Sequence, residues 1–187
     1  MNTTYTIVIV VLVLVIVGGI LGLVFSRRKH SEKLQNKFGS EYDHTVQTMG
    51  TEKKAQAELE GRQKHVDALD IHPLSVNERQ RYTADWAAVQ SRFVDRPGQA
   101  IVDADRLIIE VMQVRAYPVS DFEQRAADIS VNYPELVSNY RAARAIAVKN
   151  EQQKATTEEL RQAMIYYRSL FEELLGKEVV VEKEKLR

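Results

Sequence analysis

Apolar residues are distributed along this chain in two different ways. From Tyr5 to Phe25 they form a continuous segment without a charged residue, and every residue from Ile7 to Val17 is Ile, Val or Leu. A helix needs roughly 20 such residues to cross the hydrocarbon core of a bilayer. Beyond this segment, apolar residues recur every three or four positions, which is the spacing of one helix face. The pattern predicts an all-α protein with one N-terminal transmembrane helix plus a soluble multi-helix bundle.

The same pattern divides the chain into four regions. Residues 1–26 are the predicted transmembrane anchor, and residues 27–72 form a basic flank and a polar helical stalk. Residues 73–176 carry the amphipathic stripes of a helical bundle core, and residues 177–187 form a charged tail. About 160 residues remain beyond the anchor, which is enough for one domain with a single core.

Charges beside the apolar segment predict its orientation. A cleavable signal peptide has a basic start, an apolar core of about 7 to 15 residues and a small-residue cleavage site. This chain has none of the three, and Arg27, Arg28 and Lys29 follow the apolar segment directly. Because basic flanks stay in the cytoplasm, these residues act as a topology signal. We expect an uncleaved single-pass anchor in the cell membrane, with the N-terminus outside and the domain in the cytoplasm.

Two glycines lie four residues apart within the apolar segment, at Gly18 and Gly22. Small residues at this spacing let two membrane helices approach closely and pack, which would give a homodimer. Glycine is also common in membrane spans without such a role. Both interpretations stay open on the sequence alone.

The stalk is predicted to contain two helices separated by glycines. Ser40 is expected to cap a short helix that ends at Gly50. The next helix, residues 52–69, is charged or polar at most positions. Its apolar stripe is limited to Ala55, Leu59, Val66 and Leu69. This composition predicts a solvated spacer that holds the bundle away from the bilayer.

Helix starts in the bundle are marked by capping signals. Ser75, Ser120 and Thr156 each precede a Glu by three residues, which is the capping-box pattern. Pro97 and Pro134 fit the first position of a helix, where the missing N–H is tolerated. The helix after Thr156 is expected to end at Gly176.

Four apolar stripes are expected to face the bundle core, one of them over residues 136–147. The strongest contains Ile101, Ala104, Leu107, Ile108, Val111 and Met112. The helix before it carries Tyr82, Trp86, Val89 and Phe93, and the last helix carries Leu160, Met164, Tyr167, Phe171 and Leu174. Because only a short turn at 95–98 separates the first two helices, we expect them to pack antiparallel at the centre of the core.

Composition narrows the function classes. The chain has 26 basic and 26 acidic residues, so no global field attracts a nucleic acid. It contains no cysteine, which excludes disulfides and thiolate chemistry. The pair Glu41 and His44 forms a single Glu-x-x-His, whereas a di-iron bundle uses two with further glutamates. We therefore expect no metal and no cofactor.

One polar cluster is a candidate for a ligand groove. Asp121, Glu123, Arg125 and Asp128 lie close together in the sequence around a predicted helix start, near Tyr117 and Tyr133. The candidate groove residues among them are Tyr117, Asp121, Glu123 and Arg125. Carboxylates with shifted pKa values in a cleft are typical of functional sites. The alternative is that these charges are paired helix caps at the corner between two helices.

Several segments resemble a known bacterial family. They are residues 38–43 (FGSEYD), Arg81-Tyr82 with Trp86, Val89-Gln90, Phe93-Val94-Asp95, Ala104-Asp105, and Tyr117-Pro118 through residues 122–128 (FEQRAAD). The chain resembles an uncharacterised bacterial family of single-span membrane proteins with an all-helical domain, often labelled hypothetical or secreted. The resemblance implies an all-helical bacterial protein and supplies no activity, cofactor or catalytic residue.

The sequence thus favours a membrane-anchored protein-interaction or scaffolding module over an enzyme. Its expected partners are the lipid bilayer and either a second copy or another protein. The alternative is a small ligand-binding or catalytic helical domain with a polar site between Tyr117 and Arg125.

Overall fold

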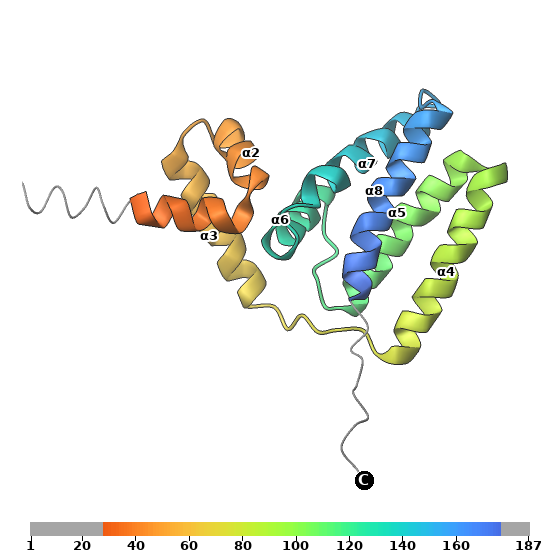
Figure 1. The fold of residues 1–187 in the computed structure, drawn as a ribbon, viewed down its shortest axis with the longest axis horizontal. Coiled ribbons are helices and arrows are strands. Elements are labelled where there is room, and N and C mark those ends of the chain that lie inside the picture. Colours follow the sequence, from red (N-terminus) through yellow and green to blue (C-terminus); the bar gives the residue numbers. More distant parts are fainter. Residues whose placement is uncertain (1–27, 177–187) are drawn as a thin grey trace, which may run out of the picture. The chain divides into compact units, whose positions relative to one another are not determined.

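The computed structural model describes residues 28–176, and this part contains helices and loops without a strand (Figure 1). The helices are residues 28–38, α2 (Ser40–Met49), α3 (Glu52–Asp67), α4 (Val76–Asp95), α5 (Pro97–Val114), α6 (Phe122–Asn132), α7 (Val137–Glu151) and α8 (Thr157–Leu175). The prediction of an all-α fold is confirmed for the described residues.

Several predictions fall on residues that the structure does not describe. The apolar segment of residues 5–25, with Gly18 and Gly22, lies outside the described residues, as does Arg27. The charged tail of residues 177–187 also lies outside them. Within residues 28–176, no helix has both the length and the apolar character needed to cross a bilayer.

The chain divides into two compact units, with the boundary inside α3 between Leu59 and Glu60. In the described part, the first unit contains the helix of residues 28–38, α2 and the beginning of α3. The second unit contains the end of α3 and the helices α4 to α8.

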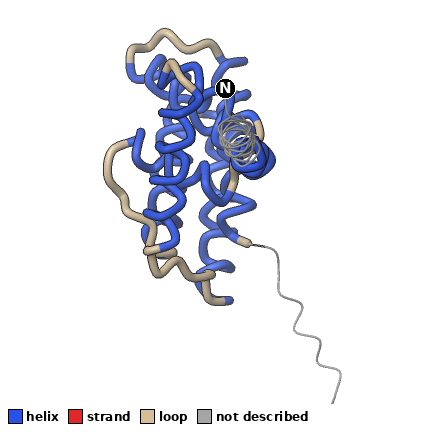
Figure 2. The backbone as a smooth tube through the Cα atoms, turned by 90° about the vertical axis from the view of Figure 1, so that its left-hand side faces the viewer, coloured by secondary structure: helices blue, strands red, loops and turns tan. Residues whose placement is uncertain are grey.

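The bundle of the second unit is organised around α5. This helix packs against α4 and α8, and α7 packs against α8 and α6 (Figure 1). Figure 2 shows the same backbone coloured by secondary structure, with helices in blue and the loops between them in tan. The two most extensively buried helices are α5 and α8, whereas α4 buries only Tyr82, Trp86 and Val89. The core is therefore centred on α5 with α8, and the prediction that α4 and α5 form its centre is wrong in this respect.

Aromatic packing explains how α4 is held on this core. The ring of Trp86 on α4 stacks on Phe171 of α8, with centroids 4.6 Å apart and an interplanar angle of 18°. Phe93, expected to be core, is only partly buried. The predicted stripe of α8 is confirmed, since all of its members are buried: Leu160, Met164, Tyr167, Phe171 and Leu174.

Two of the three predicted capping boxes are confirmed. Ser75 caps α4 with Glu78, and Thr156 caps α8 with Glu159, each with both reciprocal hydrogen bonds present. The predicted end of α8 is also confirmed, because Gly176 follows it with φ +73°, a conformation that favours glycine.

Three predicted helix starts are wrong. Gly39, with φ +50°, is the cap of α2, so Ser40 is already helical. Asp121 caps α6 by accepting from the Gln124 N–H at 3.0 Å, in place of Ser120. Pro134 belongs to a turn closed by the Leu136 N–H bonding to the Tyr133 carbonyl, and α7 starts only at Val137.

The prediction that α3 is a solvated spacer is also wrong. Ala55 and Leu59 are completely buried, and Val66 is 5% exposed. A narrow stripe therefore suffices to bury one side of the helix, although its composition is mostly polar.

Candidate functional site

The four residues of the predicted groove do not meet in one place. Asp121 and Glu123 are exposed, Asp121 as the cap of α6 and Glu123 in its first turn. Tyr117 and Arg125 are buried, with exposed fractions of 3% and 8%. The Tyr117 hydroxyl accepts a hydrogen bond of 2.8 Å from the Asn132 side chain. The carboxylates of Asp121 and Glu123 thus face solvent, whereas the side chains of Tyr117 and Arg125 are buried in the bundle.

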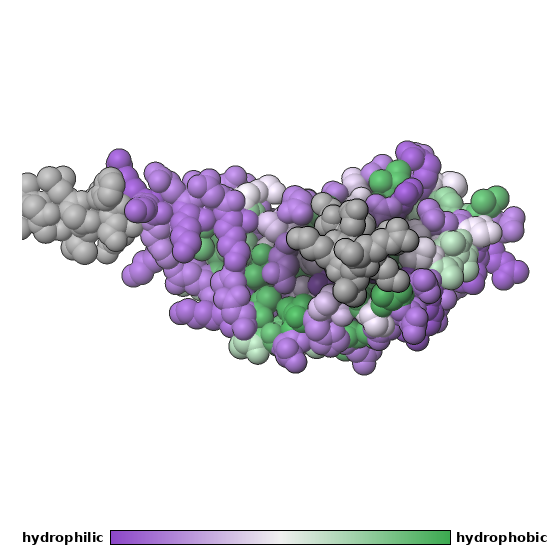
Figure 3. Space-filling model, turned by 60° about the horizontal axis from the view of Figure 1, so that its bottom comes forward, coloured by the Kyte–Doolittle hydropathy of each residue, from purple (hydrophilic) through white to green (hydrophobic). Residues whose placement is uncertain are grey.

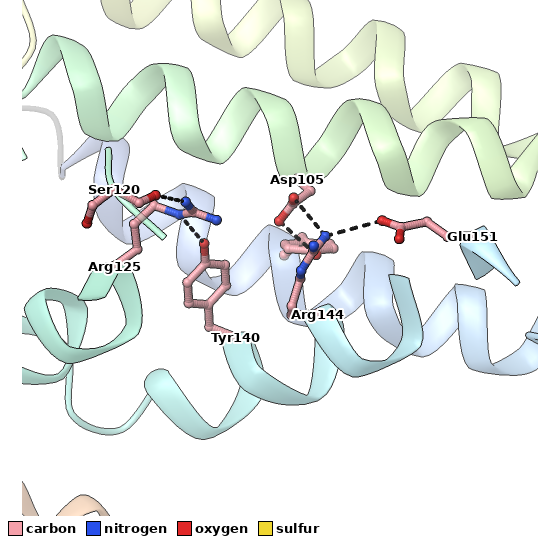
Figure 4. Close-up of polar contacts among 7 residues, drawn as sticks. Asp105, Ser120, Arg125, Tyr140, Arg144 and Glu151 are labelled. Carbon is pink, nitrogen blue, oxygen red and sulfur yellow. Dashed lines mark hydrogen bonds and ion pairs between the residues drawn. The ribbon is translucent and has the colours of Figure 1, made fainter. Parts of the chain in front are cut away.

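Arg125 connects α6 to α7 and to the loop before α6. Its guanidinium donates to the Ser120 carbonyl and, at 3.3 Å, to the Tyr140 hydroxyl on α7 (Figure 4). Burial raises the pKa of Tyr140, which keeps this hydroxyl protonated. The phenol and the guanidinium therefore satisfy each other, as buried polar groups must.

A second polar node joins three helices of the core. The Tyr167 hydroxyl on α8 donates to Asp105 on α5 at 3.0 Å. Arg144 on α7 lies 3.5 Å from the other oxygen of the same carboxylate and 3.5 Å from Glu151 (Figure 4). Burial, reinforced by the negative charge of Asp105, raises the pKa of Tyr167. These contacts connect α5 to α7 and α8 through the carboxylate of Asp105.

Asp103 forms a third node, on α5. It accepts from Gln99 at 3.1 Å and pairs with Arg92 and Arg106. Burial alone would raise the pKa of Asp103, but the hydrogen bonds and positive charges around it hold the pKa below its usual value. Asp103 stays ionised, and its role in the described structure is to link α4 and α5.

The buried carboxylate of Asp128, on α6, has a hydrogen-bond partner at only one of its two oxygens among the described residues. Its Oδ1 accepts from Gln124 at 2.8 Å and lies 3.6 Å from His65 Nε2, at the end of α3. Its Oδ2 has no hydrogen-bond partner among residues 28–176. Burial raises the pKa of Asp128, while Gln124 and the charges of His65 and Arg62 oppose this shift.

His65 is 45% exposed, whereas Asp128 beside it is fully buried. A carboxylate behind a solvent-facing imidazole can orient it as a general base. The neighbouring hydroxyl of Ser130, however, donates to the Ala127 carbonyl at 2.6 Å. The arrangement places a solvent-facing imidazole beside a buried carboxylate and offers no activated serine in this position. Asp128 belongs to the polar cluster that the sequence singles out, but its burial beside His65 could not be predicted, because His65 lies 63 positions earlier in the chain.

The first unit contains a polar groove of about 590 Å³ between the helix of residues 28–38 and α3. Its lining residues are Arg28, Ser31, Glu32, Gln35, Glu52, Lys53 and Gln56. Arg28, which was predicted as part of the topology signal, therefore lines a concave surface, and Lys29 beside it is exposed. The other groove residues were not singled out in the sequence, because a groove depends on how two helices lie together.

Within residues 28–176, no group of three or more His, Asp or Glu side chains is placed to hold an ion. Glu41, from the single Glu-x-x-His, is 2% exposed, whereas His44 is exposed.

No protein-family model, curated protein or solved structure matches this chain. The resemblance to the bacterial family of single-span helical proteins therefore stays a prediction.

Proposed function

We propose that this chain is a single-pass membrane protein whose helical part serves as a protein-interaction or scaffolding module in the cytoplasm. The observation that carries the proposal is the uninterrupted apolar segment from Tyr5 to Phe25, followed at once by Arg27, Arg28 and Lys29. Its length suits one crossing of the bilayer, and its charges favour a cytoplasmic domain.

The polar groups inside the bundle support a scaffolding role. Asp103, Asp105 and Arg125 each bind partners on a neighbouring helix or loop. Fully satisfied networks of this kind make a core rigid and specify one arrangement. Outside the core, hydrophilic side chains cover most of the face in Figure 3. A helical bundle with an ordered core and a hydrophilic surface is suited to binding other proteins through that surface.

The proposal predicts a covalent complex when the full chain is crosslinked in native membranes. A lysine-reactive crosslinker should convert the 21.4 kDa chain into one or more discrete larger species. A species of twice that mass identifies self-association, and another mass identifies a different partner. A chain that stays monomeric over the whole range of crosslinker concentrations would contradict the proposal.

A variant in the membrane segment separates two forms of self-association. If dimers form through the glycine face, replacing Gly18 and Gly22 by leucine should abolish the dimer band. Replacing Leu12 and Leu14 by isoleucine is the matched control, because it preserves both the apolar character and the glycine pair.

A small-ligand role for the α6 region is the second candidate, favoured by the buried Asp128 beside the exposed His65. A thermal-shift screen with small anions and amines can test it. A hit that is lost in Asp128→Asn and retained in Asp121→Asn would favour a ligand site there. Equal responses in both variants would exclude Asp128 from such a site.

A further inference from the structure

The groove of the first unit is built from one face of each of two helices. The helix of residues 28–38 contributes Arg28, Ser31, Glu32 and Gln35, which are spaced by three, one and three residues. Residues at these spacings lie on the same side of a helix. From the opposite side, α3 contributes Glu52, Lys53 and Gln56. Each lining residue carries a polar or charged group at the end of its side chain, so the groove offers hydrogen bonds and charges to a ligand.

The walls of the groove are held by a buried hydroxyl. Tyr42 on α2 is 2% exposed, and its hydroxyl lies 3.0 Å from Ser31 Oγ and 3.0 Å from Gln56 Nε2. One phenol thus connects α2 to a residue of each wall. The distance between the two walls is therefore fixed by their shared contact with Tyr42, so the groove is preformed.

The charges of the groove are balanced and separated. Arg28 and Lys53 are positive, Glu32 and Glu52 are negative, and all four side chains are exposed. Within residues 28–176, no ion pair joins any of these four side chains to another. Both signs of charge are therefore available to a ligand that carries both signs itself.

The groove also lies close in sequence to the predicted anchor. Arg28 follows Phe25 by three positions, so their Cα atoms are at most about 11 Å apart in any backbone conformation. The headgroup layer on each side of a bilayer is about 5–8 Å thick. If the anchor spans the membrane as proposed above, Arg28 lies within reach of lipid headgroups.

We propose that this groove binds the phosphoethanolamine headgroup of a phospholipid, with the phosphate near Arg28 and Lys53 and the ammonium near Glu32 and Glu52. Ser31, Gln35 and Gln56 can bond the remaining oxygens. This inference rests on the proposed membrane anchorage and adds a specific lipid to it.

The lining residues discriminate among headgroups. A primary ammonium has three N–H donors for carboxylates. The quaternary ammonium of choline has none and is usually held by aromatic rings, which are absent from the described groove lining. The phosphoglycerol headgroup is negatively charged and has no ammonium, so it would meet the two carboxylates without a positive group to offset them. The order of preference is therefore phosphoethanolamine over phosphocholine and phosphoglycerol.

The test uses the full chain in nanodiscs that contain equal parts of phosphatidylethanolamine, phosphatidylcholine and phosphatidylglycerol. After mild detergent extraction, mass spectrometry measures the lipids that remain bound. We expect phosphatidylethanolamine to be enriched by about tenfold over the other two, which is the effect of one well-placed charged contact. Equal retention of the three lipids would overturn the proposal.

Matched variants assign the effect to the groove. Lys53→Gln and Glu52→Gln should each reduce the enrichment to about threefold or less, because threefold corresponds to about half the free energy of a tenfold preference. Lys54→Gln and Asp43→Asn change exposed charges of the same unit outside the groove lining and should leave it unchanged. Circular dichroism verifies that all four variants retain their helices. Loss of enrichment in the control variants as well as the groove variants would contradict a groove site.

A further arm distinguishes a lipid from a free metabolite. Soluble glycerophosphoethanolamine is added to the chain in nanodiscs of pure phosphatidylcholine, and its binding is followed by calorimetry. If the soluble compound binds and Glu52→Gln abolishes the binding, the groove recognises the headgroup whether it belongs to a lipid or to a free metabolite. If neither the lipid experiment nor the calorimetry detects binding, the proposal is overturned. A chain that stays in the membrane after an alkaline wash yet shows no lipid preference refutes the headgroup site alone, whereas a chain that washes off refutes the anchorage.

Discussion

Replacing Tyr167 by phenylalanine tests whether the polar node between α5, α7 and α8 holds the bundle together. The ring is fully buried, and its hydroxyl donates to Asp105 at 3.0 Å. The substitution keeps the ring and its edge-on contact with Tyr140, whose centroid is 6.3 Å away. It removes only the hydroxyl, so the change in stability reports on that hydrogen bond.

The expected loss follows from the environment of the carboxylate. A hydrogen bond to a charged group contributes about 1.5–3 kcal/mol. Since Asp105 retains Arg144 at 3.5 Å, we expect the lower part of this range, about 1.5–2 kcal/mol. That is about a 10- to 30-fold increase in the unfolding equilibrium constant. For a domain of about 100 residues, it corresponds to a fall in Tm of about 6–16 °C.

The assay is guanidinium unfolding of the full chain in detergent, followed by fluorescence. Trp86 is the only tryptophan in the sequence and is stacked on Phe171, so it reports directly on the core. Tyr166→Phe is the matched control, because this neighbouring tyrosine is partly exposed. A Tyr167→Phe variant as stable as the Tyr166→Phe variant would refute the structural role given to the node.

Three further predictions concern other parts of the bundle. Thr156→Ala should lower the free energy of unfolding by about 1 kcal/mol through loss of the α8 cap, measured by chemical denaturation with Thr157→Ala as control. Phe171→Ala should cost about 3–5 kcal/mol, because it leaves a cavity beneath Trp86, and near-wild-type stability would exclude the observed stacking. Since burial raises the pKa of Asp128 above its usual 3.8, its contribution to stability is present at low pH and is lost as pH rises through the raised pKa. Asp128→Asn should therefore gain stability relative to the wild type as pH rises in a series of unfolding curves, and a constant difference across the series would contradict a raised pKa.

The sequence predicted a helix start correctly where a single capping side chain determines it. The Ser75 and Thr156 boxes depend on residues three positions apart, so no tertiary information is needed. The stripe of α8 was equally clear, because bulky apolar residues occupy one face throughout. At Asp121, two residues that favour caps are adjacent, and the pattern could not choose between Ser120 and Asp121.

The burial of isolated residues could not be predicted in the same way. Ala55 and Leu59 lie among charged residues, and their burial depends on how α3 is placed against its neighbours. Asp128 is similar, since the desolvation that raises the pKa of its carboxyl comes from the fold around it. The predicted groove failed to converge for the same reason: adjacent residues of α6, such as Glu123 and Gln124, point in different directions around a helix.

Single-cysteine labelling tests the central claim of membrane anchorage and orientation most directly. The chain contains no cysteine, so Val94→Cys, at a position 83% exposed, introduces a unique thiol in the bundle. Thr3→Cys introduces one before the apolar segment. A membrane-impermeant maleimide should label Thr3→Cys in intact cells and Val94→Cys only after permeabilisation, with both chains retained in membranes after an alkaline wash. Labelling of Val94→Cys in intact cells would contradict a cytoplasmic bundle, and release of the chain by the wash would contradict the anchor.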